Sequence, residues 1–274
     1  MNSDLPPGET VENKTQVPPL LFPATERIGE IQHHTSLPSS TYRLQFNKNF
    51  TFADACSIVP YLARLGITHC YASPFLKSRA GSQHGYDIVD HGAFNPEIGT
   101  EEQFREFVAD LHDNHMGLIL DIVPNHMAVA TGSNPWWMDV LEDGPSSPYA
   151  QFFDIDWMPL KPDLAHKVLL PVLGDQFGKV LEAGQLVLTF EQGGFSLFYF
   201  DRRFPIATRS VGLVLRHRLN DLTQMLGDDN PHLIEYQSIL TAISHLPPRT
   251  EADEAKIAEG RREREVIRRR LNSL

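Results

Sequence analysis

Cysteine is scarce in this sequence: Cys56 and Cys70 are the only two in 274 residues, and both lie in apolar stretches. A pair this sparse is no disulfide framework, so we expect two reduced, packed thiols. No run approaches the roughly 18 apolar residues that a membrane-spanning helix requires. The segment from Met1 to Pro18 is polar and proline-rich, without the positive charge of a secretory signal. These absences predict a cytoplasmic protein.

Positive charge is also in short supply. The chain has 24 Lys and Arg against 35 Asp and Glu, which gives a formal net charge of −11. This balance disfavours a general nucleic-acid binder, because phosphate contacts need a basic surface, and it disfavours docking on anionic membranes. Apolar residues make up 41% and charged residues 22%, an ordinary composition for a soluble globular protein. A neutral ligand such as a sugar suits this surface, as do many others, and the oligomeric state stays open.

Regular structure is expected only after a flexible leader, residues 1 to about 36. The alternation from Thr41 to Phe46 predicts a short strand. Thr51 and Asp54 form a capping box for a helix that Gly66 ends. Apolar side chains at helical spacing predict one buried stripe on this helix: Ala55, Ile58, Val59, Leu62 and Leu65.

The same order then repeats. A second strand is predicted from Thr68 to Ala72, followed by a polar loop from Lys77 to Gly99. Thr100 and Gln103 cap a second helix that Gly117 closes. The nearly continuous apolar run from Leu118 to Val123 predicts a strand buried on both faces, as in a parallel sheet.

Strands alternating with helices predict right-handed βαβ units, which build either a doubly wound sheet or a closed barrel. In both architectures ligands bind at the carboxyl ends of the strands. The regular rhythm is lost from about 127 to 200, where we expect an irregular, partly β insertion with β-like runs at 186–190 and 195–200. From 210 onward the chain is predicted to be helical. Its last segment, 251–270, is most simply a solvated helical face, with an interaction helix as the alternative.

Polar residues gather where the third predicted strand ends. Asp121 lies in an apolar run and would be costly to bury alone, so it needs a partner, and an arginine from another strand fits best. Asn125 and His126 follow just beyond the strand, where they can meet a ligand. A capped strand end with satisfied polar side chains explains this segment equally well.

A second polar cluster follows the second predicted strand, from Ser82 to Asp87 with Asp90. Gly85 lets the backbone approach a neighbour closely, and Tyr86 offers an aromatic face on which a sugar ring can pack. Asp90 can bind hydroxyl groups or hold an arginine. A plain polar loop is the alternative, which becomes weaker because two such clusters follow successive strands.

These motifs resemble the α-amylase superfamily of glycoside hydrolases (family 13): Gly85-Tyr86 with Asp90, residues 95–100, and Asp121 to His126. Finer motifs resemble its maltooligosyl trehalose synthase subfamily: residues 40–45, 78–87, 135–157, 169–174 and 199–205. The resemblance covers residues 38 to 210 well and the remainder weakly. Trp136 and Trp137 belong to it, either stacking on sugar rings or anchoring the insertion, with anchoring the better reading for at least one of them.

The resemblance implies an α/β fold, a partial (β/α)8 TIM barrel with strands one to three and an irregular insertion after strand three. The implied domains are the leader 1–36, the first three βα units 37–127, the insertion subdomain 128–208 and a helical segment 209–274.

The implied reaction converts the reducing-end α-1,4 linkage of a maltooligosaccharide into the α,α-1,1 linkage of trehalose. This retaining transfer needs a carboxylate nucleophile and a carboxylic acid that protonates the leaving oxygen. In this superfamily these groups follow strands four, five and seven. After His126 the sequence has no glycine-arginine-x-aspartate-like segment, and Arg216 to Asn220 lacks the necessary Asp. We therefore assign no catalytic residue here, and expect a truncated N-terminal portion that is inactive alone.

The resemblance carries substrate contacts over to His126, Tyr86 and Asp90, and with less support to Arg43 and Gln83. A maltooligosaccharide is the implied partner. Asp121 and Asn125 match structural positions at the floor of the site. Neither a cofactor nor a metal is expected, although Asn125 matches a calcium ligand in many amylases. The alternatives are another hydrolase or glucanotransferase of the superfamily, or a fragment that binds glucan without catalysis.

Overall fold

The computed structural model describes residues 37–130 and 132–274, so the predicted leader lies outside the described part of the chain. The chain divides into two compact units, each with its own hydrophobic core. Of the described residues, the first unit comprises 37–77, Gly81–Gly85 and His91–Ile122. The second comprises Ser78–Ala80, Tyr86–Asp90 and Val123–Leu274.

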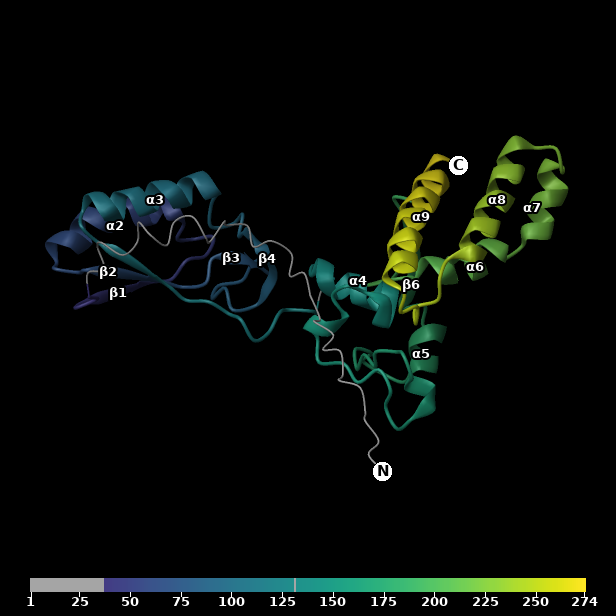
Figure 1. Cartoon of the computed structure of the whole chain (residues 1–274), viewed down its shortest axis with the longest axis horizontal. Coiled ribbons are helices and arrows are strands. Elements are labelled where there is room, and N and C mark those ends of the chain that lie inside the picture. Colours follow the sequence, from purple (N-terminus) through teal and green to yellow (C-terminus); the bar gives the residue numbers. More distant parts are fainter. Residues whose placement is uncertain (1–36, 131) are drawn as a thin grey trace, which may run out of the picture. The chain divides into compact units, whose positions relative to one another are not determined.

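A three-stranded parallel sheet in the order β1-β2-β5 is the centre of the first unit. Its strands are β1 (Thr41–Leu44), β2 (His69–Ala72) and β5 (Gly117–Leu120). In the register of the sheet, Thr41 lies beside His69, and His69 lies beside Gly117. Helices α2 (Phe52–Arg64) and α3 (Glu101–Asp113) connect these strands and lie side by side (Figure 1). The predicted α/β class is confirmed, as is the alternation of strands and helices.

Both predicted capping boxes are present. Thr51 accepts from the backbone N–H of Asp54, whose side chain accepts from Thr51 in return, and Thr100 and Gln103 do the same for α3. The apolar stripe of α2 is buried at Ala55, Val59 and Leu62. Leu65 is exposed instead, because α2 ends at Arg64 and Leu65 is its C-cap.

Phenylalanine rings fill the core between the helices and the sheet. Phe52 packs on Phe46 with ring centroids 5.2 Å apart and on Phe104 at 5.4 Å. Phe75 contacts Phe104 at 5.0 Å and Phe94 at 5.7 Å. Such aromatic contacts contribute beyond the apolar area they bury. The core therefore fastens α2 and α3 to the carboxyl ends of β1 and β2.

Two predicted boundaries in the first unit are wrong. Helix α3 ends at Asp113 with Asn114 as its C-cap, and Gly117 opens β5 instead of closing the helix. Gly117 is needed in the strand because a Cβ there would come within 2.3 Å of the His69 imidazole. Strand β5 ends at Leu120, which pairs with the last residue of β2. The expected burial on both faces is also wrong, because Leu120 and Ile122 are exposed.

The predicted loop from Lys77 to Gly99 contains regular structure. Strands β3 (Leu76–Ser78) and β4 (Ile88–Phe94) form a two-stranded sheet. Ile88 and Val89 of β4 are buried, and both residue types favour strands. The segment was predicted to be a loop because it is otherwise rich in Gly, His and Asp.

The second unit begins with helix α4 (Pro135–Asp143) and three 3-10 turns at Gly144–Ser146, Ala150–Phe152 and Pro162–Leu164. Helix α5 (Phe177–Glu182) precedes an antiparallel sheet of β6 (Leu186–Glu191), β7 (Gly194–Tyr199) and β8 (Arg202–Pro205). The two β-like runs expected here are confirmed. Positive φ angles at Gln192 and Gly193 form the tight turn that joins β6 and β7.

Four helices complete the second unit: α6 (Thr208–Arg216), α7 (Leu219–Leu226), α8 (Pro231–His245) and α9 (Glu254–Ser273). Buried residues of α6, α8 and α9 form one core, against which Leu219 of α7 and Phe195 of β7 pack. The sequence divided this part of the chain near residue 208, whereas the structure groups residues 123–274 into one unit. Helix α9 is not solvated on every face, because Arg264, Ile267 and Leu271 are buried. None of the helices within 37–130 and 132–274 has the length and apolar character needed to cross a membrane.

Candidate functional site

In the first unit, polar side chains meet where the parallel strands end. Arg43 Nη1 lies 3.0 Å from Asp121 Oδ2, and the Tyr71 hydroxyl donates to the same oxygen at 3.2 Å. The Arg43 guanidinium also lies over the Tyr71 ring, 4.6 Å from its centroid. The predicted arginine partner of Asp121 is confirmed, and it comes from β1.

The strand register explains this cluster. Arg43 of β1 pairs directly with Tyr71 of β2, so both side chains leave the sheet on the same face. Asp121 follows Leu120, the last residue of β5, and its backbone N–H donates to the carbonyl of Ala72. The sequence analysis missed Tyr71. The position of Tyr71 could have identified it. Tyr71 is the second-to-last residue of β2, as Arg43 is of β1.

Gln83 lies in an exposed loop of the first unit, and its Nε2 donates to the carbonyl of Gly81 at 3.2 Å. The predicted close approach at Gly85 is confirmed. This glycine has a φ of +76°, and a Cβ there would lie 2.3 Å from the Pro74 carbonyl oxygen. Only glycine fits such a position without a shift of the backbone.

The other predicted residues, Tyr86, Asp90, Asn125 and His126, belong to the second unit. His126 Nε2 lies 3.1 Å from the Tyr86 carbonyl oxygen, and Nδ1 lies 3.0 Å from Asn125 Oδ1. The backbone N–H of Ala128 donates to the Ile88 carbonyl at 2.7 Å. These bonds hold residues 125–128 beside residues 86–88.

The side chains of these four predicted residues differ in exposure. Tyr86, Asn125 and His126 are exposed, and Asp90 on β4 is half-buried. Nearby, the Asp87 carboxylate lies 3.5 Å from Arg79 Nε, which fixes the start of β4. An aromatic ring can receive the apolar face of a sugar, and a carboxylate and an imidazole can bind its hydroxyls.

The two tryptophans of α4 have different surroundings. Trp137 is buried and packs on Phe153 with ring centroids 5.0 Å apart, so anchoring is confirmed for this residue. Trp136 is only half-buried and stacks on Tyr149 at 5.2 Å, with 8° between the ring planes.

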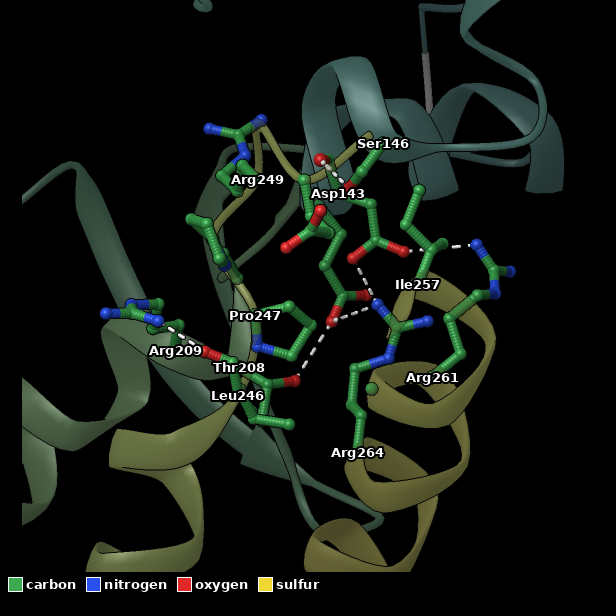
Figure 2. A pocket seen from close by; sticks show the side chains of 15 residues that line it. Asp143, Ser146, Thr208, Arg209, Leu246, Pro247, Arg249, Ile257, Arg261 and Arg264 are labelled. Atoms are coloured by element: carbon green, nitrogen blue, oxygen red, sulfur yellow. Dashed lines mark hydrogen bonds and ion pairs between the residues drawn. The ribbon is translucent and has the colours of Figure 1, made fainter. Parts of the chain in front are cut away.

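The second unit also contains a small pocket of about 50 Å³ (Figure 2). On one side Arg264 of α9 pairs with Asp143, and Arg261 donates to Asp139 at 2.6 Å. Thr208 of α6 donates to Glu142 at 3.1 Å. None of the predicted site residues lines this cavity.

The α4 carboxylates at this cavity are paired with arginines of α9. Burial raises the pKa of Asp143 above its ordinary value, and the positive charge of Arg264 opposes that shift. The hydrogen bond that Arg261 donates to the Asp139 carboxylate raises the pKa of Arg261. The cavity has room for about one or two water molecules, far too little for a sugar. We therefore interpret this cluster as the attachment of α9 to α4, and not as a ligand site.

Metal ligands do not gather within residues 37–130 and 132–274: no three His, Cys, Asp or Glu side chains there are placed to hold an ion.

Comparison with known proteins supports the resemblance. Residues 55–180 match the family model "Alpha amylase, catalytic domain". A protein of Mycobacterium tuberculosis (strain CDC 1551 / Oshkosh) that carries the name of a maltooligosyl trehalose synthase is 41% identical over 169 residues, which are 56% of this chain and 21% of that protein.

Solved structures agree. Maltooligosyltrehalose synthase from Arthrobacter ramosus is 45% identical with a TM-score of 0.55, over 62% of this chain and 21% of that one. A hypothetical maltooligosyl trehalose synthase from Sulfolobus tokodaii is 35% identical with a TM-score of 0.54, over 72% of this chain and 24% of that one. This chain thus spans about a fifth of its curated relative's length. It is similar to maltooligosyl trehalose synthases over part of their length, and part of it matches the α-amylase catalytic-domain model.

Proposed function

We propose that this chain carries part of the maltooligosaccharide site of a maltooligosyl trehalose synthase. The observation that carries the proposal is the cluster of Arg43, Tyr71 and Asp121 at the carboxyl ends of three parallel strands. In (β/α)8 barrels the substrate binds at this end of the strands. The sheet of β1, β2 and β5 then represents barrel strands one to three, and residues 128–208 represent the insertion after strand three.

Each site residue receives a role in this proposal. Tyr86 offers its ring to the apolar face of a glucose unit, and Asp90 accepts hydrogen bonds from sugar hydroxyls. His126 binds a hydroxyl by exchanging one of its two present partners, Asn125 or the Tyr86 carbonyl. Asp121, whose carboxylate Arg43 neutralises, and Asn125 keep the structural roles that the resemblance implies.

The reaction that this site serves moves the reducing-end glucose from an α-1,4 to an α,α-1,1 linkage. The enzyme carboxylate that forms the glycosyl intermediate and the acid that protonates the leaving oxygen are the groups that break and remake the bond. The sequence offers no candidate for either group. We therefore infer that this chain by itself binds maltooligosaccharide without converting it.

Calorimetric titration with maltopentaose tests the proposal. We expect the wild-type chain to bind, and Tyr86→Ala to weaken binding about tenfold, because the stacked ring is lost. Tyr61→Ala is the matched control, since Tyr61 is an exposed tyrosine on α2 away from the strand ends. Reducing ends should persist in the same mixture, as expected for binding without turnover.

Five outcomes count against the proposal. Wild-type chain that binds no maltopentaose, or that binds cellopentaose equally well, lacks a site for α-1,4 glucan. Equal weakening by both tyrosine substitutions removes Tyr86 from the site. Loss of reducing ends with formation of a non-reducing product overturns the inference of binding without turnover, and release of shorter sugars points to a hydrolase instead.

A further inference from the structure

The loop Gly81–Gly85 of the first unit combines exposed side chains with a fixed backbone. Gln83 and His84 are exposed, whereas Ser82 and Gly85 are buried. Ser82 Oγ accepts from the Gly85 N–H at 3.1 Å, and Gly85 lies tightly against the Pro74 carbonyl. These contacts join Gly85 to Ser82 within the loop and hold Gly85 against Pro74, two residues after the end of β2.

Two side chains from outside the loop hold the rest of its backbone. Gln45, the first residue after β1, donates from Nε2 to the carbonyl of Gln83 at 3.2 Å and to that of His84 at 3.4 Å. An amide nitrogen carries two hydrogens, so one Gln side chain can serve both carbonyls. Gln45 thereby ties the loop to the carboxyl end of β1.

Glu97 holds the other end of the loop. Both of its carboxylate oxygens lie 3.1 Å from the backbone nitrogen of Gly81, and a charged acceptor makes this the stronger attachment. Glu97 is itself oriented by Asn95, whose Oδ1 accepts from the Glu97 N–H at 3.0 Å. Asn95 is buried, and its own N–H donates to the Phe75 carbonyl.

We infer that Gln45 and Glu97 are positioning residues for the glucan site. They hold the backbone of Gly81–Gly85 so that the side chains of Gln83 and His84 face a bound sugar in a preset arrangement. The inference rests on the proposed function, because it assigns these loop side chains to that site. A loop ordered before binding loses less conformational freedom when the ligand arrives, which raises affinity.

Substitutions at Gln45 and Glu97 separate this positioning role from a general effect on folding. Gln45→Glu keeps the size of the side chain but removes both N–H donors and places a carboxylate against two carbonyl oxygens. Glu97→Ala removes the acceptor, whereas Glu97→Gln keeps one acceptor oxygen. Glu106→Ala is the control, because Glu106 is an exposed carboxylate on α3 of the same unit.

Hydrogen exchange of the amides of Gly81–Gly85 is the first measurement. Loss of a charged or double hydrogen bond should speed this exchange about tenfold in Gln45→Glu and Glu97→Ala. The amides of α3 should exchange as in the wild type, and so should the loop in Glu97→Gln and Glu106→Ala. Loop exchange that is unchanged in the first two variants overturns the inference.

Affinity for maltopentaose is the second measurement. We expect about tenfold weaker binding in Gln45→Glu and Glu97→Ala, with recovery in Glu97→Gln. If amide exchange in the loop is faster but the affinity for maltopentaose is unchanged, Gln45 and Glu97 only stabilise the loop. That result overturns the positioning role. Absence of binding by the wild-type chain overturns the proposed function itself, and the positioning role with it. The two failures are therefore distinguishable.

Discussion

Single glycines decide how closely the first unit can pack at the strand ends. Gly66 and Gly85 have similar backbone angles, with φ of +86° and +76°. A Cβ at Gly66 meets nothing within 4 Å, whereas a Cβ at Gly85 lies 2.3 Å from a backbone oxygen. The pair therefore separates the cost of the left-handed conformation from the cost of a steric clash.

We predict that Gly66→Ala destabilises the first unit by about 1 kcal/mol, the cost of a left-handed alanine. Gly85→Ala should cost at least about 2 kcal/mol more, because the Pro74 carbonyl must move. Hydrogen exchange of the α2 and α3 amides measures the stability of this unit. Equal losses in the two variants contradict the clash.

At the scale of elements, α9 is attached to α4 by charge. Arg261, Arg264 and Arg268 of α9 contact carboxylates of α4, among them Glu142, which Arg268 Nη2 approaches to 2.6 Å. The side chain of Arg264 is only 9% exposed. Removing one partner of a buried ion pair leaves the other charge desolvated and poorly compensated.

Arg264→Ala should therefore destabilise the second unit by about 3 kcal/mol. Arg262→Ala, an exposed neighbour on the same helix, should change stability by less than about 0.5 kcal/mol. All three tryptophans, Trp136, Trp137 and Trp157, lie in this unit, so their fluorescence during urea unfolding reports on it. Similar effects of the two substitutions argue that Arg264 contributes helix propensity alone.

At the scale of the whole molecule, the sheet of the first unit ends in exposed edges. The order β1-β2-β5 leaves β1 and β5 with one neighbour each among the described residues. Ile122, just past β5, is 68% exposed. Unpaired strand edges with apolar side chains promote pairing between chains.

We predict that the chain self-associates through this edge, with an average mass that rises with concentration in light scattering. Ile122→Lys should reduce the association, because a charge at a strand edge opposes pairing. Leu213→Lys is the control, since Leu213 is 77% exposed on α6 of the second unit. A chain that stays monomeric, or that responds only to Leu213→Lys, contradicts association through the edge.

The sequence by itself determined the features that depend on near neighbours along the chain. The capping boxes of Thr51 and Thr100 and the apolar stripe of α2 need only residues within one or two helical turns. The alternation of strands and helices along the chain followed from the same local signals. The sequence also predicted a cationic partner for Asp121, because burying an unpaired carboxylate within an apolar run costs free energy.

Only the tertiary structure decided which distant residues meet. It chose Arg43 and Tyr71 as the partners of Asp121, and Gln45 and Glu97 as the holders of the loop Gly81–Gly85. It also buried Arg264 in a helix whose mixed charges predicted a solvated face. Such pairings join residues tens of positions apart, so strand register and helix packing determine them, and no local pattern records either.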